Sequence, residues 1–290
     1  PKLQKTNNEA KPYDLKKPFA SLASDYVPDG QYKVYNSHDS LVMWMKPTPI
    51  NGQTEYGPHA GSWNYTFANF ATESAIITSG QGFERDFYYY NFDGSNDYMT
   101  LPTLAIAGNE LTFSVWNFGI LSQMSSIIIL GDTGDNSGGR ILSVHLPHNG
   151  NTVYFDKGTT PGSGQSGPGN QYDRINKNAT NAEYQGWHHW DFTANASTGS
   201  MKIYLDGILW HSGTGKTKTF SNANGNVRNI GVNHTLQEGG GGYYHRGYIS
   251  NLQIYKKELS QAEVIHNFDA MKGRFEQKPL ILSGISYSVT

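Results

Sequence analysis

Two short segments of the sequence are rich in carboxylate and amide oxygens, the ligands that calcium prefers in proteins. Their candidate ligands are Asp93, Asn96, Asp97, Asp132, Asp135 and Asn136. Ca²⁺ takes roughly six to eight oxygen ligands, and a single loop often supplies several of them. Tight turns also favour Asp and Asn, because these side chains accept hydrogen bonds from nearby backbone N–H groups. Calcium binding is therefore one interpretation of both segments, and ordinary turn formation is the other.

Two further segments combine aromatic rings with polar side chains, as sugar-binding sites do. One of them is "YYHR", which follows a run of four glycines, and the other is "QYDR". The candidate glycan-binding residues are Tyr172, Asp173, Arg174, Tyr243, Tyr244 and His245. The alternative is that both segments are only flexible loops rich in tyrosine.

The histidines do not predict a transition-metal site. His188 and His189 are adjacent in a segment that alternates as a strand, so their side chains point to opposite faces and do not easily share one ion. His145 and His148 lie on either side of a proline, which is typical of a turn. We interpret all four as structural residues.

The sequence also lacks the usual catalytic signatures. Glu84 and Asp86 share one face of a predicted strand, but no second Glu completes a set of catalytic carboxylates. There is no serine nucleophile elbow, phosphate-binding loop or dinucleotide-binding fingerprint. We therefore predict no catalytic residues, and a protein that is not an enzyme.

The elements that must position these residues are short strands. The 19 Tyr and 33 Gly favour twisted strands joined by tight turns, in one all-β domain. A net charge of −2 gives no reason to expect nucleic acid as a partner. The absence of cysteine excludes disulfides and thiolate metal sites. No apolar run reaches the roughly 18 residues of a membrane-spanning helix, so we predict no membrane insertion.

Alternation of apolar and polar residues locates the strands. In "SMKIYLDGILW", Ile203 and Leu205 share one face, and Asp206-Gly207 predicts a two-residue hairpin turn. Residues 157–186 are rich in Gly and Pro and predict a long loop. Since no strands alternate with helices, two stacked antiparallel sheets are expected. The predicted core positions are Trp190, Phe192, Ile203, Leu205 and Ile254.

Four segments carry a family resemblance when they are taken in order. They are "NFDGSNDYMTLP", "ELTFSVWNFG", "GWHHWDFTANASTGSMKIYLDGILW" and "GYISNLQIYKKELSQAEVIHNF". Together they resemble the laminin-G-like members of the concanavalin A-like lectin/glucanase superfamily. The resemblance implies an antiparallel jelly-roll sandwich of two sheets, with calcium possible at its rim. In the last segment, Ser260 and Glu263 predict a capped helical turn that covers an edge of the sandwich.

Three regions are expected along the chain. Residues 1–37 carry several lysines and prolines without a regular hydrophobic period, which predicts an extended N-terminal arm. Residues 38–275 are expected to form the sandwich, and residues 276–290 a C-terminal tail. We expect the arm to bind a neighbouring subunit, although a disordered tail is the alternative. Its apolar anchors are Phe19, Leu22, Tyr26 and Val27.

The leading hypothesis is a non-catalytic, surface-exposed module that serves assembly or adhesion, such as a decoration or fibre subunit of a virion. A glycan-binding adhesion module of an extracellular protein is the second hypothesis. A polysaccharide hydrolase or lyase is the third, but the catalytic strand motifs of the glucanases and alginate lyases in this superfamily are missing here. The expected partners are neighbouring subunits and glycans, at a virion surface or outside the cell.

Overall fold

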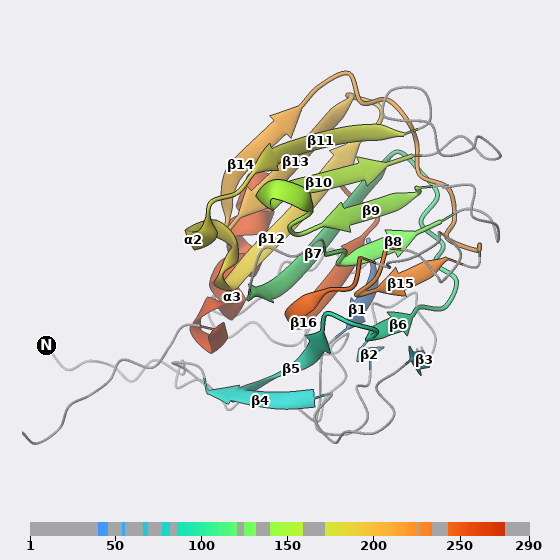
Figure 1. Ribbon diagram of the computed structural model, residues 1–290. Coiled ribbons are helices and arrows are strands. Elements are labelled where there is room, and N and C mark those ends of the chain that lie inside the picture. The colour runs from blue at the N-terminus through green and yellow to red at the C-terminus, as the bar shows by residue number, and fades with distance from the viewer. Residues whose placement is uncertain are drawn as a thin grey trace, which may run out of the picture.

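Two antiparallel sheets stack face to face in a computed structural model of the chain (Figure 1). The structure describes residues 40–45, 54–55, 66–68, 77–81, 86–120, 125–131, 140–158, 172–225, 227–233 and 243–275. The candidate residues that lie outside this part of the chain are Phe19, Leu22, Tyr26, Val27, Asp132, Asp135 and Asn136. The predicted all-β, two-sheet sandwich is confirmed.

The larger sheet contains nine strands among the described residues. They are β1 (Leu41–Met45), β2 (Thr54–Glu55), β4 (Ile77–Gln81), β5 (Asp86–Asp93), β7 (Glu110–Gly119), β12 (Gly186–Asn195), β13 (Ser200–Leu205), β14 (Ile208–Gly213) and β16 (Arg246–Tyr255). The main order is β14-β13-β12-β7-β16-β1-β2, and β5 pairs with both β16 and β4. The long strands β7, β12 and β16 therefore lie side by side, although they are far apart in the sequence.

The smaller sheet contains seven strands in the described part of the chain and lies in front of the larger sheet in Figure 1. They are β3 (Thr66–Ala68), β6 (Tyr98–Thr100), β8 (Ile128–Leu130), β9 (Leu142–His145), β10 (Thr152–Lys157), β11 (Asp173–Asn178) and β15 (Arg228–Ile230). Their order is β11-β10-β9-β8-β15-β6-β3. The strands β8 to β11 thus follow the chain as neighbours, which sets polar residues of three successive strands side by side on the outer face.

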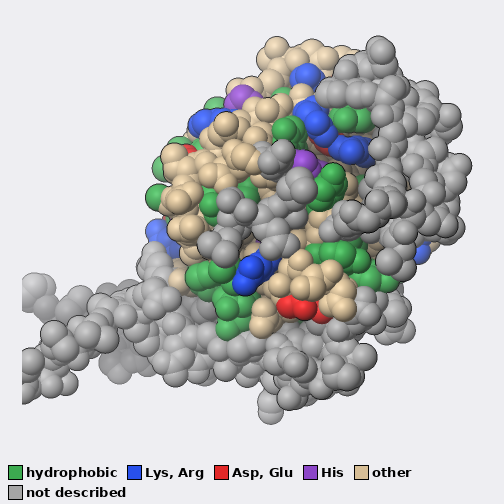
Figure 2. Space-filling view, viewed as in Figure 1, with side chains coloured by type: hydrophobic (Ala, Val, Ile, Leu, Met, Phe, Trp, Pro, Cys, Tyr) green, Lys and Arg blue, Asp and Glu red, His purple; other side chains and the backbone are tan. Residues whose placement is uncertain are grey.

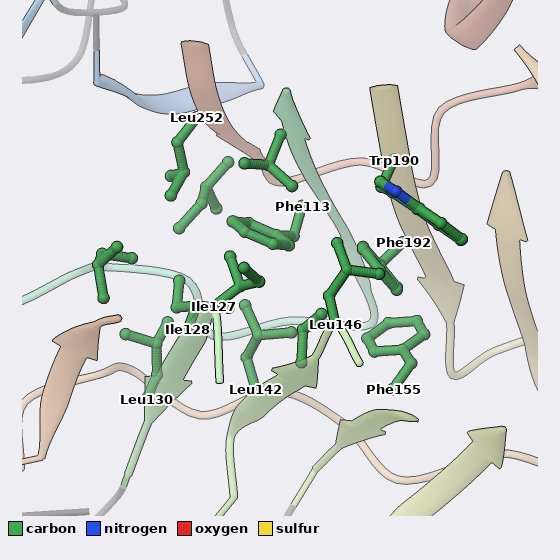
Figure 3. Packing of buried hydrophobic residues seen from close by; sticks show 14 of the residues in the cluster. Phe113, Ile127, Ile128, Leu130, Leu142, Leu146, Phe155, Trp190, Phe192 and Leu252 are labelled. Carbon is green, nitrogen blue, oxygen red and sulfur yellow. The ribbon is translucent and has the colours of Figure 1, made fainter. Parts of the chain in front are cut away.

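The core lies between the two sheets and is built from the apolar faces of their strands. Phe113 and Phe192 face each other across β7 and β12, with ring centroids 5.9 Å apart, and Phe155 from the smaller sheet packs against Phe192 at 5.5 Å. Figure 3 shows these rings beside the aliphatic side chains that fill the space between the sheets. Four of the five predicted core residues are fully buried, whereas Leu205 is only partly buried.

A 15-residue helix, α3 (Gln261–Phe275), follows the last strand. The predicted cap is confirmed, because the Ser260 backbone N–H donates to Glu263 and the Glu263 N–H donates back to the Ser260 hydroxyl. The helix is longer than the single predicted turn because Val264, Met271 and Phe275 bury an apolar stripe on the outer face of the larger sheet. It contacts β5, β12 and the edge strand β14, so it covers a face of the sandwich as well as an edge.

Two local predictions have different outcomes. The hairpin turn between β13 and β14 is confirmed, with left-handed φ angles of 50° at Asp206 and 82° at Gly207. The prediction of one long loop over residues 157–186 is wrong in part, because β11 and the short helix α2 (Asn181–Tyr184) lie within it. Pairing with β10 stabilises β11 even though its own sequence, "DRINKN", has little strand character.

Candidate functional site

Polar side chains of β9, β10 and β11 gather on the outer face of the smaller sheet. Val153 and Phe155 point into the core, so Tyr154 and Asp156 point outward by the two-residue period of a strand. The register places Tyr154 opposite His145 on β9, and Asp156 opposite Arg174 on β11. Figure 2 looks onto this face and shows Lys and Arg side chains beside histidine, with hydrophobic side chains around them.

Asp156 lies at the centre of this group and is fully buried. One of its oxygens accepts hydrogen bonds from Arg140 Nη1 at 2.5 Å and Arg174 Nη2 at 2.7 Å, and the other accepts from Arg174 Nε at 2.5 Å. Such paired, charge-assisted bonds hold a guanidinium in one orientation. The three side chains together carry one net positive charge.

Tyrosine rings pack against the two guanidinium groups. The Arg174 guanidinium carbon lies 4.5 Å from the ring centre of Tyr154 and 5.1 Å from that of Tyr172, and that of Arg140 lies 4.9 Å from Tyr172. A cation over an aromatic face is attracted by the electron density of the ring. Tyr154 is partly exposed and forms the rim of the group, whereas Tyr172 is buried and forms its floor.

His145, His148 and Tyr243 extend the group toward β8. The ring centre of His148 lies 4.6 Å from that of His145, 5.4 Å from that of Tyr154 and 4.9 Å from that of Tyr243. Burial lowers the pKa of His145 to about 3, although Asp156 opposes the shift. Burial and the two arginines also lower the pKa of His148. Both imidazoles are therefore neutral at neutral pH. His145 is buried with Nδ1 3.1 Å from the Ser125 carbonyl oxygen, whereas His148 is partly exposed and offers an uncharged polar group at the surface.

These eight residues form what we call the Arg–Tyr–His cluster: Arg140, His145, His148, Tyr154, Asp156, Tyr172, Arg174 and Tyr243. It brings together residues from both predicted glycan-binding segments, which are about 70 positions apart in the sequence. Tyr172, Arg174 and Tyr243 belong to it. Tyr244, the next residue after Tyr243, is partly exposed.

The other two predicted glycan-binding residues have structural contacts elsewhere. Asp173 is buried, lies 3.3 Å from the buried ammonium of Lys157, and accepts a hydrogen bond from the backbone N–H of Lys218. His245 is buried, with Nδ1 only 2.6 Å from the Ser125 hydroxyl. Both side chains therefore stabilise the sandwich beside the cluster, and neither reaches the exposed rim.

Five cluster residues were not among the predicted site residues: Arg140, His145, His148, Tyr154 and Asp156. A signal for three of them exists in the sequence, because "LSVH" and "TVYFD" alternate polar and apolar residues on strands whose apolar faces are fully buried. The polar faces of both strands therefore had to meet on one surface. His145 and His148 were interpreted as structural residues on either side of a proline turn. The structure places His145 at the end of β9 and His148 just after the turn, and it brings their side chains into the cluster.

The first of the predicted calcium segments forms a turn held by its own carboxylates. Asp93 Oδ1 accepts hydrogen bonds from the backbone N–H groups of Ser95 and Asn96, at 2.7 and 3.3 Å. Asp97 Oδ2 accepts from the Asp93 N–H at 2.9 Å. Among the described residues, no three acidic, histidine or cysteine side chains lie close enough to hold one metal ion. The two carboxylates therefore have a structural role in this turn.

A second group of titratable residues lies beneath α3, on the outer face of the larger sheet. His189 Nε2 is 2.9 Å from the Ser114 hydroxyl, and His189 Nδ1 is 3.1 Å from Asp191 Oδ2. This order of groups is that of a hydrolase triad, but all three side chains are completely buried. Phe268 of α3 covers the His189 ring at 6.2 Å, so substrate has no access to this serine.

Burial also determines the charge of this pair. It raises the pKa of Asp191 from 3.8 to about 8 and lowers that of His189 to about 3. Both groups are therefore neutral in the folded protein at neutral pH. His188, the neighbour of His189, bonds instead to Asp206 at 2.7 Å, so the adjacent histidines have separate partners, as expected from strand geometry.

The fold and the cluster define a lectin-like sandwich with a polar, aromatic site on one outer sheet face. The family model Laminin_G_3, described as the concanavalin A-like lectin/glucanases superfamily, matches residues 93–265, more than half of the chain. The chain therefore belongs to this superfamily, as its four segments predicted. No curated protein matches the sequence.

Several solved structures share this fold at low sequence identity. One is the binding domain of botulinum neurotoxin DC in complex with rat synaptotagmin II, at 16% identity and a TM-score of 0.55, covering 81% of this chain and 52% of that one. Another is the serotype C1 binding domain, at 15% identity and a TM-score of 0.56, covering 81% and 53%. The chain thus spans about half the length of these domains, and at this sequence identity the similarity is limited to the fold.

No helix in the described part of the chain has the length and apolar character needed to cross a membrane.

Proposed function

We propose that the chain is a non-catalytic, extracellular binding module that recognises glycans through the Arg–Tyr–His cluster. The observation that carries the proposal is the arrangement of partly exposed Tyr154, His148 and Arg174 around a buried, fully bonded Asp156. Sugars bind where aromatic faces meet fixed polar groups. Here the guanidinium and imidazole groups supply those polar partners.

The geometry supports binding because the rim is held in place before a ligand arrives. Asp156 fixes Arg174 through two hydrogen bonds, and Arg174 in turn packs on Tyr154. A preorganised rim loses little side-chain entropy on binding. Arg174 uses Nε and Nη2 for Asp156, which leaves Nη1 as a donor on a side chain that is 20% exposed.

Two features favour binding over catalysis. The carboxylate of the cluster is buried and bonded to two arginines, so it is poorly placed to act as a nucleophile or a proton donor. The Ser114 group on the other sheet is closed off by α3. Incubation with any glycan that binds should therefore release no new reducing ends or unsaturated products.

Some of the structural neighbours are toxin proteins with glycan ligands. Cell entry of botulinum neurotoxin type C depends on interaction with two ganglioside molecules. The binding domain of neurotoxin DC is known in complex with SialylT. Because those domains share only the fold, they support a binding role for this chain without specifying its sugar.

A glycan array probed with the full chain tests the proposal directly, followed by calorimetric titration of the strongest glycan. We expect Tyr154→Ala to weaken that binding at least tenfold. The matched control is Tyr98→Ala, which removes another partly exposed tyrosine from a different strand of the same sheet. If no glycan binds, or if both variants bind like the parent, the cluster is not a glycan site.

The assembly role of the arm stays a prediction, because residues 1–37 lie outside the described part of the chain. We propose that it acts together with glycan binding in a surface-exposed assembly such as a virion fibre or decoration. Deletion of residues 1–25 tests this role without touching the cluster.

A further inference from the structure

A pocket of about 210 Å³ lies between α3 and the outer face of the larger sheet. Its walls are Trp116 from β7, Trp187 from β12, the Asp206 turn between β13 and β14, and three residues of α3: Phe268, Lys272 and Phe275. The Arg–Tyr–His cluster lies on the outer face of the other sheet. The pocket is therefore separate from the proposed glycan site.

The aromatic walls of the pocket are fixed by one another. Trp116 stacks on Phe275, with ring centres 4.0 Å apart and an angle of 13° between the planes, and Phe268 extends the stack at 5.7 Å. Trp187 meets Phe275 at 5.0 Å and an angle of 48°, so its ring is inclined to the stack. Trp187 is partly exposed, whereas Trp116 is almost completely buried. Two differently oriented aromatic surfaces therefore flank the pocket.

Two groups of opposite charge complete the lining. Asp206 is held in the hairpin turn, because Oδ1 accepts the His189 backbone N–H at 2.9 Å and Oδ2 bonds to His188 Nδ1 at 2.7 Å. Its side chain is still 32% exposed, and each oxygen keeps a further lone pair. Lys272 lies on α3, is 43% exposed, and pairs with Asp269 at 2.7 Å.

We propose that this pocket binds a single neutral sugar unit, as a second glycan site. The apolar face of a pyranose ring stacks on an aromatic ring, while its hydroxyls both donate and accept hydrogen bonds. Asp206 accepts from a hydroxyl and Lys272 donates to one. The lining carries one charge of each sign, so a ligand without net charge suits it. The volume of about 210 Å³ suits a small ligand such as a single sugar ring.

The turn and the helix that line the pocket pack directly against each other. Gly207 has a left-handed φ of 82°, which glycine adopts without strain, and a β-carbon at this position would be in van der Waals contact with Ile265 of α3, at 3.4 Å. The helix therefore packs directly against the turn that carries Asp206. The two walls of the pocket belong to elements that contact each other, which favours a preformed site.

The test uses saturation-transfer NMR of the full chain with methyl glycosides of glucose, galactose, mannose and N-acetylglucosamine. We expect at least one to bind in the millimolar range, and Trp187→Ala to weaken it at least tenfold. Tyr154→Ala, in the Arg–Tyr–His cluster, should leave this binding unchanged, which separates failure of this site from failure of the proposed function. Trp187→Phe should retain part of the affinity, because a smaller aromatic face remains.

The inference is overturned if no glycoside binds at a concentration of about 20 mM, which is well above the expected dissociation constant. It is also overturned if Trp187→Ala binds the glycoside like the parent. Loss of binding in Tyr154→Ala alone would assign the signal to the Arg–Tyr–His cluster and would also overturn it.

Discussion

Asp191→Asn should stabilise the protein increasingly as the pH rises from 4 to 8. Asp191 is completely buried between β12 and α3, where burial raises its pKa from 3.8 to about 8. The folded state thus binds a proton that the unfolded state has released over most of this range. Stability falls with rising pH wherever the folded state holds more protons. Asparagine is nearly the same size and does not titrate, so it removes this cost.

The magnitude follows from the shift in pKa. Each unit corresponds to about 1.4 kcal/mol, so the free energy of unfolding of the parent should fall by about that amount per pH unit between pH 4 and pH 8. At pH 7 the variant should be more stable by on the order of 4 kcal/mol, and near pH 4 the two proteins should be alike. Asparagine keeps a polar side chain of nearly the same size beside His189 Nδ1, which lies 3.1 Å from the aspartate oxygen.

Urea unfolding of parent and variant at pH 4, 5, 6, 7 and 8 measures this difference. Groups other than Asp191 titrate equally in both proteins, so their contributions cancel when the free energies of unfolding are subtracted at each pH. The matched control is Asp269→Asn, which changes a 52% exposed aspartate on α3 and should alter stability by less than about 1 kcal/mol at every pH.

A flat difference between Asp191→Asn and the parent across this range would refute the reasoning. So would a variant that is less stable than the parent at pH 8. Either result would mean that Asp191 is ionised in the folded protein, as one half of an ion pair with a protonated His189. The neutral form of the pair inferred from its burial would then be wrong.

Three other predictions follow from the fold and the sequence. Trp190→Ala should lower the free energy of unfolding by about 3–5 kcal/mol, as measured by urea, because it empties a fully buried site; an unchanged stability would contradict its core position. If the Asp93 turn binds calcium, EDTA should lower the melting temperature of the parent and leave that of Asp97→Ala unchanged, and an unchanged parent would leave the segment as an ordinary turn. Deletion of residues 1–25 should lower the mass of any oligomer measured by light scattering, and an unchanged mass would leave the arm without an assembly role.

Local patterns in the sequence were sufficient for the architecture. Alternation of apolar and polar residues located the long central strands, because one face of each strand must be buried. Asp206-Gly207 predicted its turn because left-handed backbone angles at two successive positions suit few other residue pairs. Ser260 and Glu263 predicted the start of α3 in the same way, since both bonds of the cap lie within four residues.

The ends and coverings of these elements depend on distant residues and were therefore not predicted. The sequence indicates where α3 begins, but its length is set by packing of Phe275 on Trp116, a residue about 160 positions earlier. β11 lies in a segment with weak strand propensity and is stabilised by pairing with β10. In both cases a long-range contact outweighs local preference.

The candidate site shows the same division. From the sequence alone, strand alternation determined that His189 and Asp191 share the polar face of their strand, but only the tertiary structure shows that α3 buries this face and neutralises both groups. Likewise Tyr172, Arg174 and Tyr243 were recognisable as candidates, whereas their meeting with Tyr154 and Asp156 depends on which strands are neighbours. Alternation specifies the face of a strand on which a side chain lies. It does not specify what covers that face, because the covering segment is chosen by the free energy of the whole fold.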